Sequence, residues 1–289
     1  MAKPSTLKKS KTSVKNSKPH HPTTDKKAAE FDETVIIRKL ADSDTEIREK
    51  ALAALAQHIA TRKTIDPFKL QKIWKGLFFS VWHSDGALAQ QQLAQDLADL
   101  TVKVNQVNYW SYIESFWMIM CREWHTIDKH RINKFYMLVR RVFGAILIRL
   151  RENKWNDIAQ YQSTISQFPL DAFDAKIPHG IRMHVCDIIL DEIEKVADND
   201  DEAIPIEGLL QPIISFVEST SFKTVKLFAI ENVLQDPRLA GWGYVSSYIK
   251  PEAAIEEEDS DAFESDEPVA ESADENSEDE AEEEFTGFD

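Results

Sequence analysis

The residues best suited to chemistry are few and lie mostly in the middle of the chain. Cys121 and His125 are four positions apart, so on a helix they share one face, as a cysteine nucleophile and its base require. Two histidine pairs, His125 with His130 and His179 with His184, are five apart, a step that separates ligands on a helix by about 140°. Cys121 also lies in an aromatic-rich apolar pattern, where cysteine usually acts as a small hydrophobic residue. We therefore expect neither nucleophilic catalysis nor a metal site.

Other catalytic patterns are equally weak. Phosphate-binding loops need clustered glycines, but the 289 residues contain only eight, with neither a P-loop nor GxGxxG. The acidic residues between Asp187 and Glu194 share their segment with Lys195, which is typical of a solvated helix face. A ribonuclease would need converging acidic metal ligands, for which there is no sign. The sequence predicts a protein that is not an enzyme and has no cofactor and no small-molecule substrate.

The strongest local charge feature is the segment 122–154, with nine Lys and Arg against three acidic residues. Its functional use would be contact with RNA or an acidic partner. The alternative is structural, because Lys and Arg stems often cover the margins of an apolar stripe. The candidate contacts divide between two flanks of the helix, with Arg140 and Arg151 on one and Arg131, Lys134, Arg141 and Arg149 on the other.

Charge is divided unevenly along the chain, whose net charge is −16. Residues 251–289 hold 19 Asp and Glu and no Lys or Arg, whereas residues 1–27 hold eight lysines and one Asp. Neither end has much apolar surface to bury. We expect a disordered basic arm (1–27), a folded domain (28–250) and a disordered acidic tail (251–289).

Both ends offer short signals. Lys8, Lys9 and Lys11 are nuclear-import candidates, although the arm could serve solubility alone. Four tail serines next to acidic residues are possible phosphorylation sites, namely Ser260, Ser265, Ser272 and Ser277. The two cysteines form no disulfide framework and no apolar run reaches the roughly 18 residues of a membrane span. We expect a reducing, intracellular setting and no membrane partner.

Apolar residues recur at helical spacing throughout the central domain and predict an all-α fold. No segment alternates like a strand. We expect stacked antiparallel helices, an irregular HEAT-like repeat or α-solenoid, rather than a compact bundle. The predicted helices cover about 44–62, 67–82, 85–104, 110–127, 127–152, 155–166, 181–197, 206–219 and 222–234.

Local signals refine these helices. Ser43 with Glu46 has capping-box spacing, Asp66 precedes a proline at the first helical position, and Asp85 is placed to cap the next helix. Leu88 falls on the inward side of that helix. The tryptophans follow the apolar stripes and are predicted to be core residues.

Three blocks resemble the ribosomal RNA processing protein 1 family. They are KIWKGLFFSVWHSDGALAQQQLAQDLADL (Lys72 to Leu100), EWHTIDKHRINKFYMLVRRVF (Glu123 to Phe143) and PHGIRMHVCDIILDEIEKV (Pro178 to Val196). The sequence departs from the family's pattern at His83 and at 86–89, which concerns the surface of one turn.

The resemblance implies a nucleolar, hence nuclear, biogenesis factor of the large (60S) ribosomal subunit, needed for maturing the precursor of the 5.8S and large-subunit RNAs. It implies a helical-repeat scaffold without catalytic residues. Its partners would be pre-ribosomal RNA, ribosomal proteins and other assembly factors, including a Brix-domain protein. The alternative that the charge pattern leaves open is an acidic-tailed chaperone or transport adaptor for basic proteins.

Overall fold

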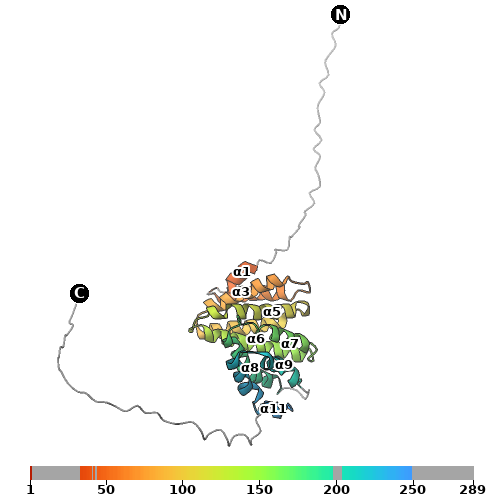
Figure 1. The fold of residues 1–289 in the computed structure, drawn as a ribbon. Helices are drawn as coiled ribbons and strands as arrows, with labels where there is room; N and C mark the ends of the chain where they lie inside the picture. The colour runs from red at the N-terminus through yellow and green to blue at the C-terminus, as the bar shows by residue number, and fades with distance from the viewer. Residues whose placement is uncertain (2–32, 41, 43, 198–203, 249–289) are drawn as a thin grey trace, which may run out of the picture. The chain divides into compact units, whose positions relative to one another are not determined.

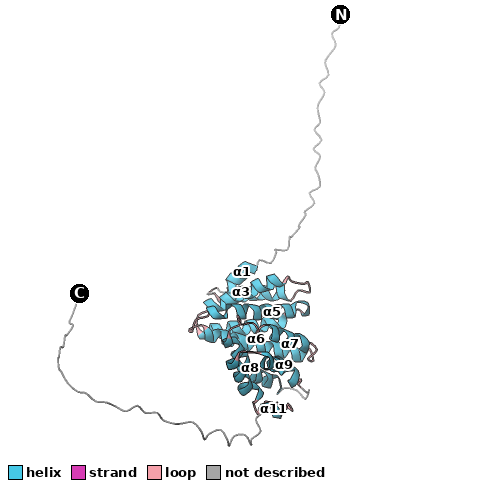
Figure 2. Ribbon diagram, viewed as in Figure 1, coloured by secondary structure: helices cyan, strands magenta, loops and turns pink. Residues whose placement is uncertain are grey.

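A computed structural model of the chain describes residue 1 and residues 33–248, apart from 41, 43 and 198–203. The described part is built from helices, with no strand (Figure 2). The predicted all-α class is confirmed. The elements are α1 (Glu33–Leu40), α2 (Thr45–Ile59), α3 (Pro67–His83), α4 (Ala87–Lys103), α5 (Gln106–Glu123), η1 (Trp124–Thr126), α6 (Ile132–Glu152), α7 (Ile158–Gln167), α8 (His179–Ala197), α9 (Ile206–Ser219), α10 (Lys223–Ala229), η2 (Ile230–Leu234) and α11 (Arg238–Gly241).

The helices stack in two rows (Figure 1). In the odd row α1 packs on α3, α3 on α5, α5 on α7 and α7 on α9. In the even row α2 packs on α4, α4 on α6, α6 on α8 and α8 on α10. Each helix therefore meets its row neighbours two positions away along the chain, which is how antiparallel pairs stack in an α-solenoid. The repeat architecture predicted from the sequence is the one observed.

Aromatic rings fill the space between the helices. Trp74 of α3 lies 4.9 Å from Tyr112 and 4.8 Å from Phe116 of α5, measured between ring centroids. Phe78 of α3 lies 4.5 Å from Phe135 of α6, so it joins the two rows. Buried rings of this kind each remove roughly 150–250 Å² from water. The tryptophan stripes act as core, as predicted, and Trp74 is fully buried.

Helix starts follow the predicted chemistry with two differences. The side chain of Asp66 accepts a hydrogen bond from the Phe68 amide at 2.8 Å, as expected for a cap before Pro67. Helix α2 is capped by Asp44, whose side chain accepts a hydrogen bond from the Glu46 amide at 2.8 Å. The predicted cap, Ser43, lies outside the described residues. The predicted Asp85 cap is wrong: the residue before α4 is Gly86, with φ of 84°, a conformation that favours glycine.

Two further predictions need correction. Leu88 is 83% exposed, because it lies in the first turn of α4 before the neighbouring helices cover it. The helix expected over 127–152 begins only at Ile132, because η1 and a turn occupy 124–131. The predicted arm and tail lie outside the described residues. No helix of the described part is both long and apolar enough to cross a bilayer.

Candidate RNA and partner interface

Helix α6 carries five of the six predicted contact residues, and the sixth, Arg131, directly precedes it. The helix lies in the even row between α4 and α8. Its two flanks face different neighbours. Arg140 and Arg151 reach α8, whereas Arg141 and Arg149 reach α4. For these four residues the two predicted flanks therefore correspond to two packing interfaces, one with α8 and one with α4.

Lys134 is 6% exposed, and its ammonium group is held inside the fold. Its Nζ donates hydrogen bonds to the carbonyl oxygens of Trp82 at 2.7 Å and Ser84 at 2.9 Å. These carbonyls stand at the C-terminal end of α3, where the helix dipole favours a cation. Burial lowers the pKa of Lys134. The residue anchors the end of α3 and presents little of its charge to solvent.

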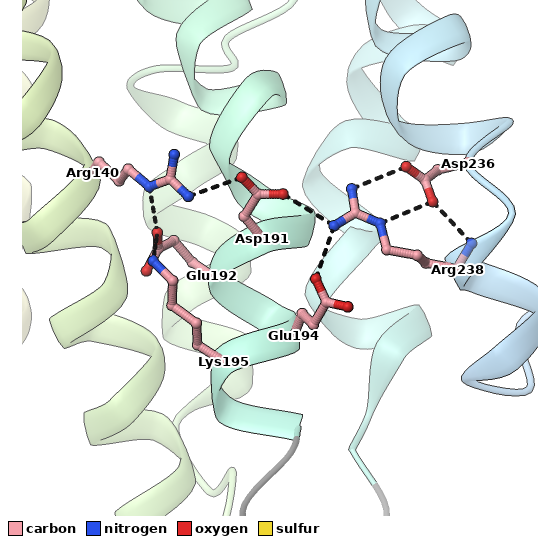
Figure 3. Close-up of polar contacts among 7 residues, drawn as sticks. All are labelled: Arg140, Asp191, Glu192, Glu194, Lys195, Asp236 and Arg238. Atoms are coloured by element: carbon pink, nitrogen blue, oxygen red, sulfur yellow. Dashed lines mark hydrogen bonds and ion pairs between the residues drawn. The ribbon is translucent and has the colours of Figure 1, made fainter.

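Arg140 joins α6 to α8 through a network of ion pairs between side chains (Figure 3). Its Nε donates to Glu192 at 2.6 Å and its Nη2 to Asp191 at 2.8 Å. Arg238, the first residue of α11, donates to the other oxygen of Asp191 at 3.0 Å. Lys195 approaches Glu192 at 2.6 Å. Two acidic residues of α8 are thus shared among three cations from three segments.

The electrostatics of this network favour the charged forms. Desolvation raises the pKa of Asp191, but the hydrogen bonds from Arg238 and Arg140 outweigh it and lower the pKa below its usual value. Hydrogen bonding to Asp236 raises the pKa of Arg238. Gly144 of α6 leaves room for the carboxylate of Glu192, because a Cβ added there would lie 2.7 Å from it.

The remaining predicted residues are also used by the fold. Arg149 donates to the carbonyl of Val102 at 2.8 Å and lies 4.7 Å from the Tyr109 ring centroid. Arg151 donates to a carbonyl of α8 at 3.1 Å, and Arg141 to one of α4. Arg131 pairs with an aspartate of its own turn and stacks 4.9 Å over Trp82.

All six residues therefore have structural partners, and their contact with RNA stays a prediction. Arg131 and Arg140 keep 42% and 39% of their side chains exposed, more than the buried Lys134 does. The import candidates Lys8, Lys9 and Lys11 and the serines Ser260, Ser265, Ser272 and Ser277 lie outside the described residues.

Two of the candidate reactive residues in the middle of the chain, Cys121 and His184, are held by contacts within the fold. Cys121 is 8% exposed, and burial raises the pKa of its thiol to about 12, which keeps it protonated at neutral pH. His184 lies against the Tyr136 carbonyl, with its Nε2 at 3.0 Å from that oxygen, and burial lowers its pKa. Among the described residues, no three His, Cys, Asp or Glu side chains gather as metal ligands do.

Arg182 is a further buried cation that the sequence analysis did not single out. It is fully buried, and its guanidinium donates to the carbonyls of Asp171 and Asp174, both at 2.7 Å, and to that of Ile177. It also lies 4.6 Å from the centroid of the Phe222 ring. Arg182 therefore fixes the connection between α7 and α8 on the core.

One exposed surface was also missed. Phe68, Lys72, Lys75 and Phe79 recur at steps of four, three and four, so they follow one line along α3, here called the α3 stripe. Phe68 is 60% and Phe79 41% exposed. This surface could have been predicted from the sequence, because the four residues fall outside the inward-facing apolar pattern of the same helix.

The geometry defines an all-helical repeat protein. Residues 32–288 match the family model described as "Nucleolar protein, Nop52".

Ribosomal RNA processing protein 1 homolog B of Homo sapiens is 36% identical over 176 residues, covering 56% of this chain and 22% of the relative. The Drosophila melanogaster ribosomal RNA processing protein 1 homolog is 32% identical over 193 residues, covering 64% of this chain and 28% of the relative. The Dictyostelium discoideum homolog is 25% identical over 225 residues, covering 69% of this chain and 45% of the relative. The chain thus spans less than half the length of each of these relatives.

The protein belongs to the Nop52 family of nucleolar proteins, in which its relatives carry the name ribosomal RNA processing protein 1. This confirms the family resemblance drawn from the three sequence blocks. Its compartment is the nucleolus within the nucleus.

Proposed function

We propose that the protein is a non-catalytic biogenesis factor of the large (60S) ribosomal subunit. It supports processing of the precursor that yields the 5.8S and large-subunit RNAs within nucleolar pre-ribosomes. The observation that carries this proposal is the match of residues 32–288 to a nucleolar family whose relatives are named for ribosomal RNA processing.

A scaffold role is supported by how the fold uses its reactive groups. The thiols of Cys121 and Cys186 are buried, and burial raises the pKa of both to about 12. The basic residues of α6 hold helices together, and the large aromatic side chains fill the core. What remains for recognition is the outer surface of two helical rows, the kind of extended surface that solenoids offer to partners.

The partners in this proposal are pre-ribosomal RNA, ribosomal proteins and other assembly factors, including a Brix-domain protein. Arg131, Arg140 and Arg141 remain candidate contacts through the parts of their side chains that reach solvent. Lys134, Arg149 and Arg151 would act mainly by fixing the helices that present those surfaces. We further propose the division into arm (1–27), helical domain (28–250) and tail (251–289).

Depletion with complementation tests the function. Cells depleted of the protein should accumulate the precursor of the 5.8S and large-subunit RNAs, while small-subunit RNA continues to mature. The reintroduced chain should sediment with pre-60S particles and restore processing. Normal precursor ratios after depletion, or a chain that stays outside the particles, would overturn the proposal.

The acidic tail supports a second candidate, a chaperone or adaptor for basic proteins, because 19 carboxylates lie within 39 residues. Removal of residues 251–289 separates the two. An assembly scaffold should still join pre-ribosomes through its helical body, whereas a carrier should lose its basic cargo and its function.

A further inference from the structure

The outer face of α3 combines exposed aromatic rings with cations in one line. Phe68 and Phe79 stand at the ends of the α3 stripe, about 16 Å apart along the helix axis. Lys72 and Lys75 stand between them, and the side chain of Lys75 is 49% exposed. The ammonium group of Lys72 lies 4.7 Å from the centroid of the Phe68 ring, so the first ring and the first cation are already in contact.

The surroundings of the stripe are also basic. Arg122, at the end of α5, is half exposed, and Arg38 and Lys39 are exposed on the neighbouring α1. Two acidic side chains lie next to the stripe. Asp66 caps α3 beside Phe68, and the carboxylate of Glu123 is approached by Lys75 at 3.5 Å and by Arg122 at 2.9 Å. The Glu123 carboxylate thus faces two cations, and the local charge stays positive.

Helix α3 itself carries three lysines and no acidic residue. Helices α4 and α8 differ, because they carry exposed acidic side chains, among them Asp99, Asp187 and Glu194. A polyanion would therefore be attracted to α3 more strongly than to α4 or α8.

The order of residues along the stripe decides between two acidic partners. A helical protein segment docks through apolar anchors at successive positions of one line. Here the two central positions are lysines, which would interrupt such an anchor line. Single-stranded nucleic acid suits the order better, because bases stack on exposed rings while phosphates pair with the cations between them.

We propose that the α3 stripe is a binding site for single-stranded RNA. The rings of Phe68 and Phe79 stack on bases, and Lys72 and Lys75 contact the phosphates between them. The site rests on the proposed function, which brings the protein to precursor RNA, and it deepens that function by placing a direct RNA contact on α3 in addition to the candidates on α6.

The test is fluorescence anisotropy with the full chain and a labelled single-stranded oligo-uridine of about fifteen nucleotides, titrated over a range of salt concentrations. Lys72→Glu with Lys75→Glu should weaken binding by about ten-fold or more and reduce the salt slope by about 1.4, as expected for two lost phosphate contacts. Lys72→Gln with Lys75→Gln should show the same slope change without adding repulsion beside Glu123.

Two further variants separate stacking from charge. Phe68→Ala and Phe79→Ala should each weaken single-strand binding about five-fold, with little change in the salt slope. Lys50→Glu with Lys103→Glu is the matched control, because it makes the same charge change on exposed residues of the even row. The control should bind nearly as the unmodified chain does, and circular dichroism should show equal helix content in all variants.

The inference is overturned if the stripe variants bind the RNA as the control does. It is also overturned if poly-glutamate displaces the RNA at equal charge while both phenylalanine variants bind normally, because the face would then serve an acidic protein. Sedimentation of the same variants keeps the two proposals apart. A chain that enters pre-ribosomes but binds no RNA leaves the proposed function intact, whereas one that binds RNA through α3 but never enters the particles refutes that function alone.

Discussion

Replacing Lys134 with Met tests whether the basic residues of α6 serve the fold. Met keeps an unbranched stem of similar length in the space that Lys134 fills, but it cannot donate to the carbonyls of Trp82 and Ser84. Hydrogen bonds that involve a charged group contribute roughly 1.5–3 kcal/mol each. Removing the buried ammonium group recovers part of its desolvation cost. The expected net loss is about 2–3 kcal/mol of the free energy of unfolding.

The assay is thermal and urea unfolding followed by circular dichroism. For a folded body of this size the loss corresponds to a Tm about 4–12 °C lower. Lys129→Met is the control, because Lys129 is exposed in the turn before α6 and its replacement should change stability by less than about 0.5 kcal/mol. If Lys134→Met unfolds like the control but binds RNA markedly less, Lys134 is a contact residue and our structural reading of it is wrong.

Three further predictions concern buried and paired groups. Arg182→Met should cost about 3 kcal/mol or more in urea unfolding, since three loop carbonyls lose their donor; a stable variant would contradict the anchoring role. The folded-state pKa of Asp191 is depressed, so its stabilisation is present above its ordinary pKa of 3.8 and is lost as pH falls through the lower folded value. Asp191→Asn should therefore flatten the stability profile below about pH 4; an unchanged profile would argue against the ion network. Cys121 and Cys186 should react with a thiol reagent at pH 8 only as the chain unfolds; rapid labelling of the native protein would refute their burial.

The helices could be predicted because their signals are local. Apolar spacing placed nearly all the main helices within a few residues, and Asp66 with Pro67 fixed the start of α3. Helix α1 was not predicted as a separate element, because eight residues give too few turns for a clear period. Leu88 was predicted to face inward but is exposed. Periodicity gives the direction of a side chain, but it does not show whether a neighbouring helix covers that side chain.

The role of the α6 cations could not be predicted from their own segment. Helical spacing placed Arg140 and Arg141 on opposite flanks of α6, as observed. The partners of Arg140, however, lie about fifty residues away on α8. An arginine next to an apolar stripe has the same local pattern whether it faces RNA or a neighbouring helix. The α3 stripe could have been predicted, because it forms an exposed face of a helix whose buried face the apolar spacing had already identified.

Buried aromatic stripes hold the helices together, and we propose that the exposed helical surfaces recognise pre-ribosomes. The sharpest test is to crosslink the protein to RNA in purified particles and to identify the crosslinked peptides by mass spectrometry. We expect the crosslinked RNA to be the large-subunit precursor and the crosslinks to fall on exposed residues of α1 and α3 and on Arg131, Arg140 and Arg141. Crosslinks at the buried rings of Trp74 and Trp117, or only to the small-subunit precursor, would contradict the account.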